Sequence, residues 1–253
     1  MREISRRNNL LGRAATGDTS LMAIRMARDA ALRLPPREEP APLELTLYHD
    51  VLCSWCYVAD ARLESLRDEY GNALKWSLRP YPLRPESQLP GKKERQILAR
   101  HYRRIAKESE GTGVKPDLWV GEDPPASSLP PLVALEAALV QGPGVQRELL
   151  RSMRRAAFVQ GINVARRDVQ LELASRVGLD LQSFIEALDD ESFEHAVTDS
   201  AEEAESLGIR GVPALVIGGE WLMQGCRDAS EYRHVIDKYL RERRSGPPVR
   251  TLH

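Results

Sequence analysis

The sequence predicts an α/β protein in which a small β-sheet is split, along the chain, by a long helical segment. Two stretches of alternating apolar and polar residues, at 43–48 and 74–80, flank a helical pattern. Helical spacing then dominates from residue 92 to about 207. Two short apolar strands and a closing amphipathic helix follow. The expected order is therefore β-α-β, a block of helices, and β-β-α.

The first strand is predicted at Leu43–Tyr48, where apolar and polar residues alternate strictly. A helix begins near Cys53, shows apolar residues at helical spacing up to Tyr70, and ends at Gly71-Asn72. The second strand is predicted at Leu74–Pro80. A strand, a helix and a strand in this order are typical of a right-handed βαβ unit with a parallel strand pair.

The middle of the chain is predicted to be helical, with a long loop rich in glycine, proline and serine at 111–131. The predicted helices span 92–110, 132–140, 145–160, 169–177, 181–188 and 193–207. Asp180 and Asp190 are candidate N-caps. The candidate C-terminal stops are Gly161, Gly178 and Gly208.

The end of the chain returns to strands. Ala214–Ile217 is a short apolar run, Gly218-Gly219 has the composition of a hairpin turn, and Trp221–Gln224 runs back. Residues 231–244 are predicted to form the closing helix. This order is that of a thioredoxin-like sheet with a helical insertion.

We therefore divide the chain into three parts. A thioredoxin-like domain is expected at 43–85 and 208–245, and an all-helical insertion domain at 86–207. Residues 1–42, in which arginine recurs without lysine, are expected to form a weakly ordered extension with a short helix near 21–34.

The start of this extension bears on cellular location. Ser5–Leu11 resembles a twin-arginine export signal, but charged residues interrupt the apolar run that such a signal needs next. We therefore expect a cytoplasmic protein, with export as the weaker alternative. Met22 is a second candidate for the true start.

Composition limits the classes of partner. The chain has 253 residues, of which 42% are hydrophobic and 29% charged, so a sizeable core can form. The formal net charge of −1 gives no electrostatic reason to expect nucleic acid or an anionic membrane as partner. No apolar run approaches the ~18 residues of a membrane-spanning helix. We expect a soluble monomer or homodimer that binds neither nucleic acid nor membranes.

The cysteines are the strongest chemical signal. Cys53 and Cys56 are separated by Ser54-Trp55, and Cys53 lies where a strand ends and a helix begins. Unpaired N–H groups and the helix dipole stabilise an anion there, which lowers a cysteine pKa from ~8.5 into the ~3.5–7.5 range. Cys53 is therefore the candidate nucleophile of disulfide exchange. Cys56, one turn on and more shielded, is the candidate resolving cysteine.

A zinc half-site is the alternative use of such a pair. Zinc needs two further ligands, typically a second pair at short spacing. Cys226 is single, and the histidines are scattered at positions 49, 101, 195, 234 and 253. We therefore expect no metal.

A second candidate element is Gly211-Val212-Pro213-Ala214, directly before an apolar strand. Proline at a strand entrance is ordinary turn chemistry. The functional alternative is a cis Val212–Pro213 bond, which occurs in only ~5–6% of X–Pro bonds. The residues alone leave both open.

Three segments carry a family resemblance. Tyr48–Tyr57 resembles the start of a DsbA-like thioredoxin domain, specifically of its FrnE-like branch. Trp76–Pro85 resembles that branch's second strand and exit, and Leu207–Ile217 resembles its cis-proline strand. The similarity covers about Leu43 to Leu240.

This resemblance implies disulfide exchange on substrate proteins or small thiols, with Cys53 and Cys56 as the redox pair. It implies no cofactor beyond the redox-active disulfide, with glutathione as a candidate co-substrate. The implied substrate-binding residues are Ser54, Trp55, Val212 and Pro213, the last two joined by a cis bond.

The chain departs from the branch at two positions. Serine stands at Ser54, where the branch commonly has proline, which puts the redox potential in doubt. Cys226 stands where a small residue is usual, just after a strand that returns toward the active-site edge. Cys226 is either a half-buried free thiol, which we favour, or a third thiol that exchanges with Cys53.

Other residues and functions leave alternatives open. Asp50 either holds a turn, which we favour, or assists proton movement from Cys56. Arg151, Arg154 and Arg155 are predicted to form a solvated helix face. The runner-up function is a kappa-type glutathione transferase or 2-hydroxychromene-2-carboxylate isomerase, enzymes that bind glutathione and usually keep a serine instead of paired cysteines. A non-catalytic protein-binding module is the third.

Overall fold

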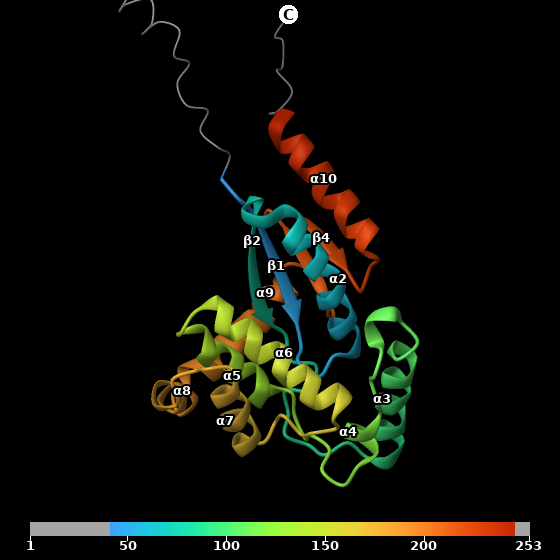
Figure 1. The fold of residues 1–253 in the computed structure, drawn as a ribbon, viewed down its shortest axis with the longest axis vertical. Coiled ribbons are helices and arrows are strands. Elements are labelled where there is room, and N and C mark those ends of the chain that lie inside the picture. Colours follow the sequence, from blue (N-terminus) through green and yellow to red (C-terminus); the bar gives the residue numbers. More distant parts are fainter. Residues whose placement is uncertain (1–40, 246–253) are drawn as a thin grey trace, which may run out of the picture. The chain divides into compact units, whose positions relative to one another are not determined.

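The computed structural model describes residues 41–245, which contain a four-stranded mixed sheet (Figure 1). Its strands are β1 (Leu43–His49), β2 (Leu74–Pro80), β3 (Ala214–Ile217) and β4 (Trp221–Gln224), in the order β2-β1-β3-β4. β1 and β2 are parallel, whereas β3 is antiparallel to both β1 and β4. The predicted thioredoxin-like arrangement is confirmed.

The alternation in β1 places its leucines on one face of the sheet. Leu43, Leu45 and Leu47 are buried in one cluster with side chains of α2 (Ser54–Tyr70) and α10 (Ala229–Ser245). The helices contribute Leu63, Leu66, Tyr232 and Ile236. Burial of apolar surface at ~25 cal/mol per Å² therefore fixes α2 and α10 against this face.

The chain between β2 and β3 is predominantly helical. Its helices are α3 (Lys92–Ile105), α4 (Asp117–Val120), α5 (Leu129–Leu139), α6 (Pro143–Val159), α7 (Arg167–Arg176), α8 (Leu181–Leu188) and α9 (Ser192–Ser206). Helices α5, α6 and α7 lie beyond the carboxyl ends of β1 and β2 (Figure 1). The proposed domain boundaries at 85/86 and 207/208 fall in the connections that precede α3 and follow α9.

Helix α2 takes part in two hydrophobic cores. Val58, near its start, is buried with the helical block, in a cluster that includes Tyr102 and Phe158. Leu63 and Leu66, further along, are buried with the sheet. The start of α2 is therefore supported by helices far away in sequence.

Several helix ends differ from the predicted ones. The helix predicted over 92–110 ends at Ile105, and a 3₁₀ turn at Ser109–Gly111 follows. Gly111 lies so close to the carbonyl of Ile105 that a Cβ would come within 1.7 Å of its oxygen, so the chain turns back there. The predicted loop at 111–131 contains α4, and α5 begins at Leu129 because prolines are tolerated in a first helical turn.

The predicted caps are largely confirmed. Asp180 caps α8 by accepting a hydrogen bond from the Ser183 N–H at 2.8 Å. The prediction of Asp190 as an N-cap is wrong by one residue, because the N-cap of α9 is Glu191. The Asp190 carboxylate still accepts a hydrogen bond from the Ser192 N–H. The three predicted glycine stops follow helices at positive φ: Gly161, Gly178 and Gly208.

The short helix predicted near 21–34 and the export-like segment at 5–11 lie outside the described residues. Within 41–245, no helix combines the length and the apolar content needed to cross a bilayer.

Candidate active site

Cys53 is the N-cap of α2, with extended backbone angles of φ −71° and ψ 116°. Its Sγ accepts a hydrogen bond from the backbone N–H of Cys56 at 3.4 Å. The Cys53 N–H in turn donates to the carbonyl of Asp50 at 3.3 Å, which closes a turn after β1. The sulfur therefore occupies the position where the oxygen of serine or aspartate usually caps a helix, and it accepts from an N–H group of the first turn that has no acceptor within the helix.

The two cysteines differ in access. Cys53 is 7% exposed and Cys56 is fully buried, and both are free thiols. Burial, followed by the hydrogen bond and charge of Cys53, raises the pKa of Cys56 well above its usual range. This asymmetry is the one expected of an attacking and a resolving thiol.

The Val212–Pro213 segment lies against Cys53 although it is distant in sequence. The Cys53 thiol donates to the carbonyl oxygen of Val212 at 3.4 Å. The Val212–Pro213 peptide bond is cis, Pro213 is buried and Val212 is half-buried. Pro213 is anchored by its carbonyl, which accepts from the Gly225 N–H at 2.8 Å. The structure thus brings together the two sequence elements singled out above.

The residues between the cysteines differ in what they can contact. Ser54 is 6% exposed and faces the interior. Trp55 is half-buried, and its ring lies 5.4 Å from the guanidinium carbon of Arg104 on α3. Of the two, Trp55 is the one with surface to offer a substrate.

Asp50 is a fully buried carboxylate that ties loops together. Its Oδ1 accepts from the Leu52 N–H and its Oδ2 from the Leu83 N–H, both at 2.7 Å. Burial raises the pKa of Asp50, partly offset by these bonds and by the hydroxyl of Ser128. Its oxygens are engaged by the loops on both sides, which favours the turn-holding role.

Cys226 follows β4 and lies beside Arg62 of α2. Its Sγ is 3.6 Å from Nη1 of Arg62. The guanidinium group of Arg62 also forms ion pairs with Glu108, Glu110 and Asp228, at 2.9–3.1 Å. Burial above all raises the pKa of Cys226 to about 11. Among the described residues no hydrogen bond or disulfide joins Cys226 to the pair, so exchange with Cys53 stays a prediction.

The sequence predicts a solvated face for the arginines of α6, and this is wrong for Arg154. Arg151 and Arg155 are exposed, but Arg154 is buried and donates to Oδ2 of Asp60 on α2 at 2.7 Å. Arg67 donates to Oδ1 of the same carboxylate at 3.0 Å. The two guanidinium groups lower the pKa of Asp60 in spite of its burial.

His49, the last residue of β1, is buried near this charge cluster. Burial and the positive charge of Arg154 lower its pKa to about 3, so the imidazole is neutral. Its Nδ1 has no hydrogen-bond partner within the described part of the chain. Sequence spacing gave no signal for the Arg154–Asp60 pair, because it joins two different helices, α6 and α2.

No group of three or more His, Cys, Asp or Glu side chains in residues 41–245 is arranged to hold a metal ion.

A family model described as a DSBA-like thioredoxin domain matches residues 44–237. The chain is 30% identical over 176 residues to the ClpXP adapter protein SpxH of Bacillus subtilis, and 29% identical over 186 residues to that of Halalkalibacterium halodurans. These similarities cover 69% of this chain but only 58% of each relative.

Solved structures show the same fold. The cytosolic disulfide reductase DsbM of Pseudomonas aeruginosa, determined with GSH, has a TM-score of 0.64 at 24% identity, over 79% of this chain and all of the other. A candidate protein disulfide isomerase of Nitrosomonas europaea has a TM-score of 0.69 at 20% identity, over 79% of this chain and 98% of the other.

Proposed function

Because the chain belongs to the DSBA-like thioredoxin family, we propose that it exchanges disulfides with substrate proteins or small thiols through Cys53 and Cys56. The observation that carries this proposal is the placement of the Cys53 sulfur. It lies at the start of α2, between the N–H of Cys56 and the carbonyl of Val212. An N–H donor stabilises a thiolate at this position, and the thiolate is the nucleophile.

In the reducing direction, the Cys53 thiolate attacks one sulfur of a substrate disulfide. The substrate S–S bond breaks, a Cys53–substrate disulfide forms, and the other substrate sulfur leaves as a thiolate that takes a proton. The Cys56 thiol then loses its proton and its sulfur attacks Cys53. The second substrate sulfur leaves as a thiolate and takes a proton. The substrate disulfide has then been reduced by two electrons, and the cysteine pair has been oxidised to the Cys53–Cys56 disulfide. The reverse sequence oxidises a dithiol.

The difference in burial between the two cysteines supports this order of steps. Cys53, at 7% exposure, is less buried than Cys56 and lies beside Val212, which favours Cys53 as the sulfur that meets a substrate. Cys56 is fully buried, and its backbone N–H donates to the sulfur of Cys53. We propose glutathione as a co-substrate and the cytoplasm as the location, since the DsbM structure is of a cytosolic disulfide reductase determined with GSH.

The test is a redox titration of the full chain against glutathione buffers, with insulin reduction as the activity. We expect reversible two-electron behaviour that is lost in Cys53→Ser. Cys56→Ser should instead accumulate a mixed disulfide on Cys53, visible by mass spectrometry. Cys226→Ser is the matched control and should titrate like the wild type. Insulin reduction by Cys53→Ser at the wild-type rate would exclude the proposal.

The SpxH similarity favours a second candidate function, an adapter that binds ClpXP. The chain matches 58% of those relatives, so the adapter role rests on that part alone. Surface plasmon resonance of the full chain against purified ClpXP tests it. Binding that persists in a Cys53→Ser/Cys56→Ser double variant would support an adapter role independent of thiol chemistry, and absence of binding would exclude it.

A further inference from the structure

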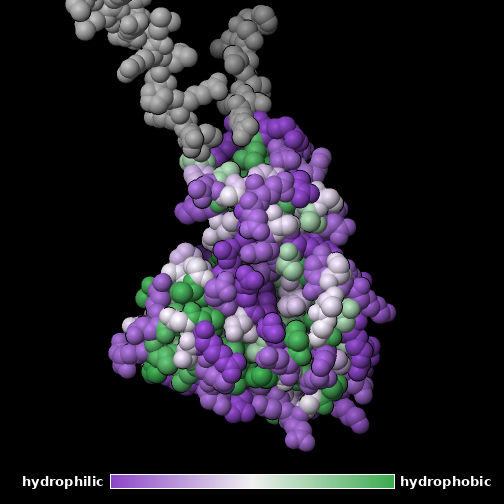
Figure 2. Space-filling model, in the orientation of Figure 1, coloured by the Kyte–Doolittle hydropathy of each residue, from purple (hydrophilic) through white to green (hydrophobic). Residues whose placement is uncertain are grey.

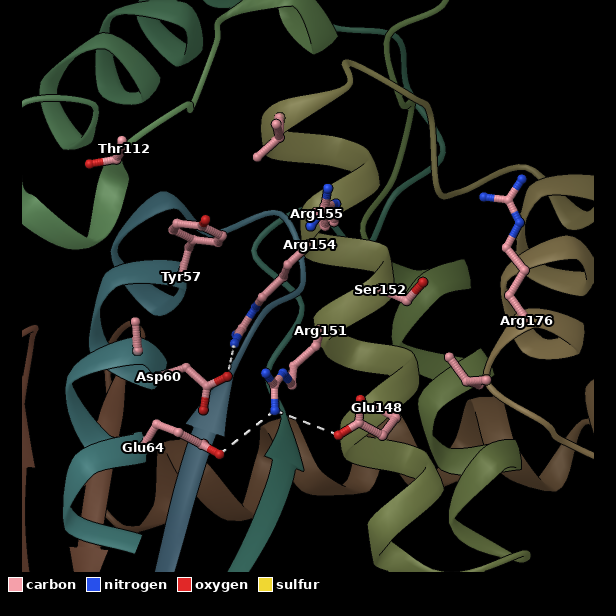
Figure 3. A pocket seen from close by; sticks show the side chains of 13 residues that line it. Tyr57, Asp60, Glu64, Thr112, Glu148, Arg151, Ser152, Arg154, Arg155 and Arg176 are labelled. Carbon is pink, nitrogen blue, oxygen red and sulfur yellow. Dashed lines mark hydrogen bonds and ion pairs between the residues drawn. The ribbon is translucent and has the colours of Figure 1, made fainter. Parts of the chain in front are cut away.

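Residues of α2, α6 and α7 line a cleft of about 750 Å³ (Figure 3). Cys53 is not among the residues that line it. Tyr57, Ala61 and Val159 give it apolar surface, and four arginines, at 151, 154, 155 and 176, give it positive charge. In Figure 2 the surface over α2 and α6 is largely hydrophilic and is hollowed between them. The volume is within the ~300–1,000 Å³ typical of small-molecule sites.

Arg154 forms the floor of the cleft, and its hydrogen bonds are incomplete. One nitrogen, Nη1, donates to Asp60, as Figure 3 shows. The other two, Nε and Nη2, have no partner among the described residues, although the side chain is only 3% exposed. A buried donor without an acceptor destabilises the protein, and more so when it is charged. This guanidinium therefore favours the approach of an additional acceptor.

The arginines at the rim are held loosely. Arg151 lies between Glu64 and Glu148 at 3.8 and 3.6 Å, beyond hydrogen-bond distance (Figure 3). Arg155 is exposed, and no ion pair involves it in residues 41–245. Exposed ion pairs contribute little to stability, so these side chains can turn toward a ligand at little cost.

The charges that line the cleft define the kind of ligand. Four arginines face three carboxylates, which leaves one positive charge in excess. Asp60 is already engaged by Arg154 and Arg67, and Glu64 by Arg67. One anionic group, rather than a polyanion, balances this set. The planar guanidinium matches a carboxylate or phosphate through paired hydrogen bonds.

We propose that this cleft binds a small organic anion. Its carboxylate or phosphate group is held by Arg154 and Arg155, and its apolar part packs against Tyr57, Ala61 and Val159. The site is independent of disulfide exchange, because none of these side chains is needed to hold or move the electrons of the cysteine pair.

Isothermal titration of the full chain with three matched probes tests the proposal. Benzoate and phenyl phosphate carry an anionic group on the same ring, and benzamide is the neutral counterpart of benzoate. We expect benzoate or phenyl phosphate to bind at least tenfold more tightly than benzamide. The tighter of the two anions identifies the group that the site prefers.

Variants locate the site. Arg155→Gln should weaken anion binding at least tenfold, and because Arg155 is exposed the fold should persist. Arg103→Gln, at an exposed position on α3, is the matched control and should bind like the wild type. Cys53→Ser should also bind unchanged, which separates this proposal from the exchange reaction. Equal binding of benzamide, unchanged binding by Arg155→Gln, or absence of binding at millimolar anion would overturn it.

Discussion

Nη1 of Arg154 donates to Oδ2 of Asp60 at 2.7 Å and thereby joins α6 of the helical block to α2 of the thioredoxin core. Arg67 holds the other oxygen of the same carboxylate at 3.0 Å. Each of these side chains is at most 12% exposed. Asp60 therefore bridges two buried guanidinium groups at the junction of the two cores, and Glu64 pairs with Arg67 as well, at 2.7 Å.

Asp60→Asn should lower the free energy of unfolding by about 2–4 kcal/mol, because it leaves buried Arg154 without a counter-charge and leaves Arg67 with Glu64 alone. Arg154→Met should lower it less, since Asp60 keeps Arg67. Urea denaturation measures both. Glu69→Gln, which breaks the exposed Arg233–Glu69 pair, is the control and should change stability by less than about 1 kcal/mol. A larger loss for Glu69→Gln than for Asp60→Asn would contradict this assignment.

His49 predicts a pH dependence of stability. Its pKa is lowered from 6.5 to about 3 in the native state, so below pH 6.5 the unfolded chain takes up a proton that the native chain does not. The contribution of His49 is therefore complete above pH 6.5 and is lost as the pH falls toward 3. Between pH 7.5 and 5 this amounts to about 2 kcal/mol.

The measurement is urea denaturation across that pH range for the wild type and His49→Gln. The difference between the free energies of unfolding of the two proteins removes the contribution of the carboxylates and leaves that of His49. This difference should narrow as the pH falls. His101→Gln, on the exposed side of α3, should give a profile parallel to the wild type. Parallel profiles for His49→Gln would mean that His49 has the same pKa in the native and the unfolded chain, and would contradict the lowered native pKa.

Asp50 can be tested as a loop anchor against a role in proton transfer. Asp50→Ala leaves the N–H groups of Leu52 and Leu83 without acceptors and should destabilise the protein by about 2–4 kcal/mol. Asp50→Asn keeps one acceptor and should destabilise it less. In stopped-flow measurements, the Asp50→Asn variant should resolve the Cys53 mixed disulfide at a rate within threefold of that of the wild type. A much slower resolution in a stable Asn variant would show that the carboxylate moves the proton of Cys56.

Cys226 should be an unreactive thiol. With a pKa of about 11, roughly 0.1% of it is thiolate at pH 8, against about a quarter for an unperturbed cysteine. Iodoacetamide should therefore label Cys226 at least 100-fold more slowly in the native than in the urea-unfolded chain. Disulfide mapping after mild oxidation should give the Cys53–Cys56 bond alone, and a bond from Cys226 to either cysteine would establish the third-thiol alternative.

The local pattern predicted the elements well, for a physical reason. Alternation of apolar and polar residues specified β1 and β2, and short runs next to glycine and proline specified β3 and β4. These are properties of short segments. Helix ends were less predictable, because tertiary contacts such as the approach of Gly111 to Ile105 decide where a helix stops.

The residues alone revealed the site only where one segment carries it, and Val212 with Pro213 came from the family resemblance. Cys53 and Cys56 lie on one helical turn, so spacing revealed them. The partnership of Arg154 with Asp60 joins residues 94 positions apart, and helical spacing on α6 gave no indication that one of three neighbouring arginines points inward. Such pairs depend on how two helices meet, which a single sequence does not encode locally.

Helix α2 has a consequence for the modularity of this protein. Val58 is buried by the helical block, while Leu63 and Leu66 are buried by the sheet. Deletion of residues 86–207 would therefore expose Val58 and the start of α2, where the cysteines lie. The inserted segment is thus not a removable accessory to a self-sufficient thioredoxin unit. A shortened chain would keep both cysteines and lose the scaffold that holds the first turn of their helix in place.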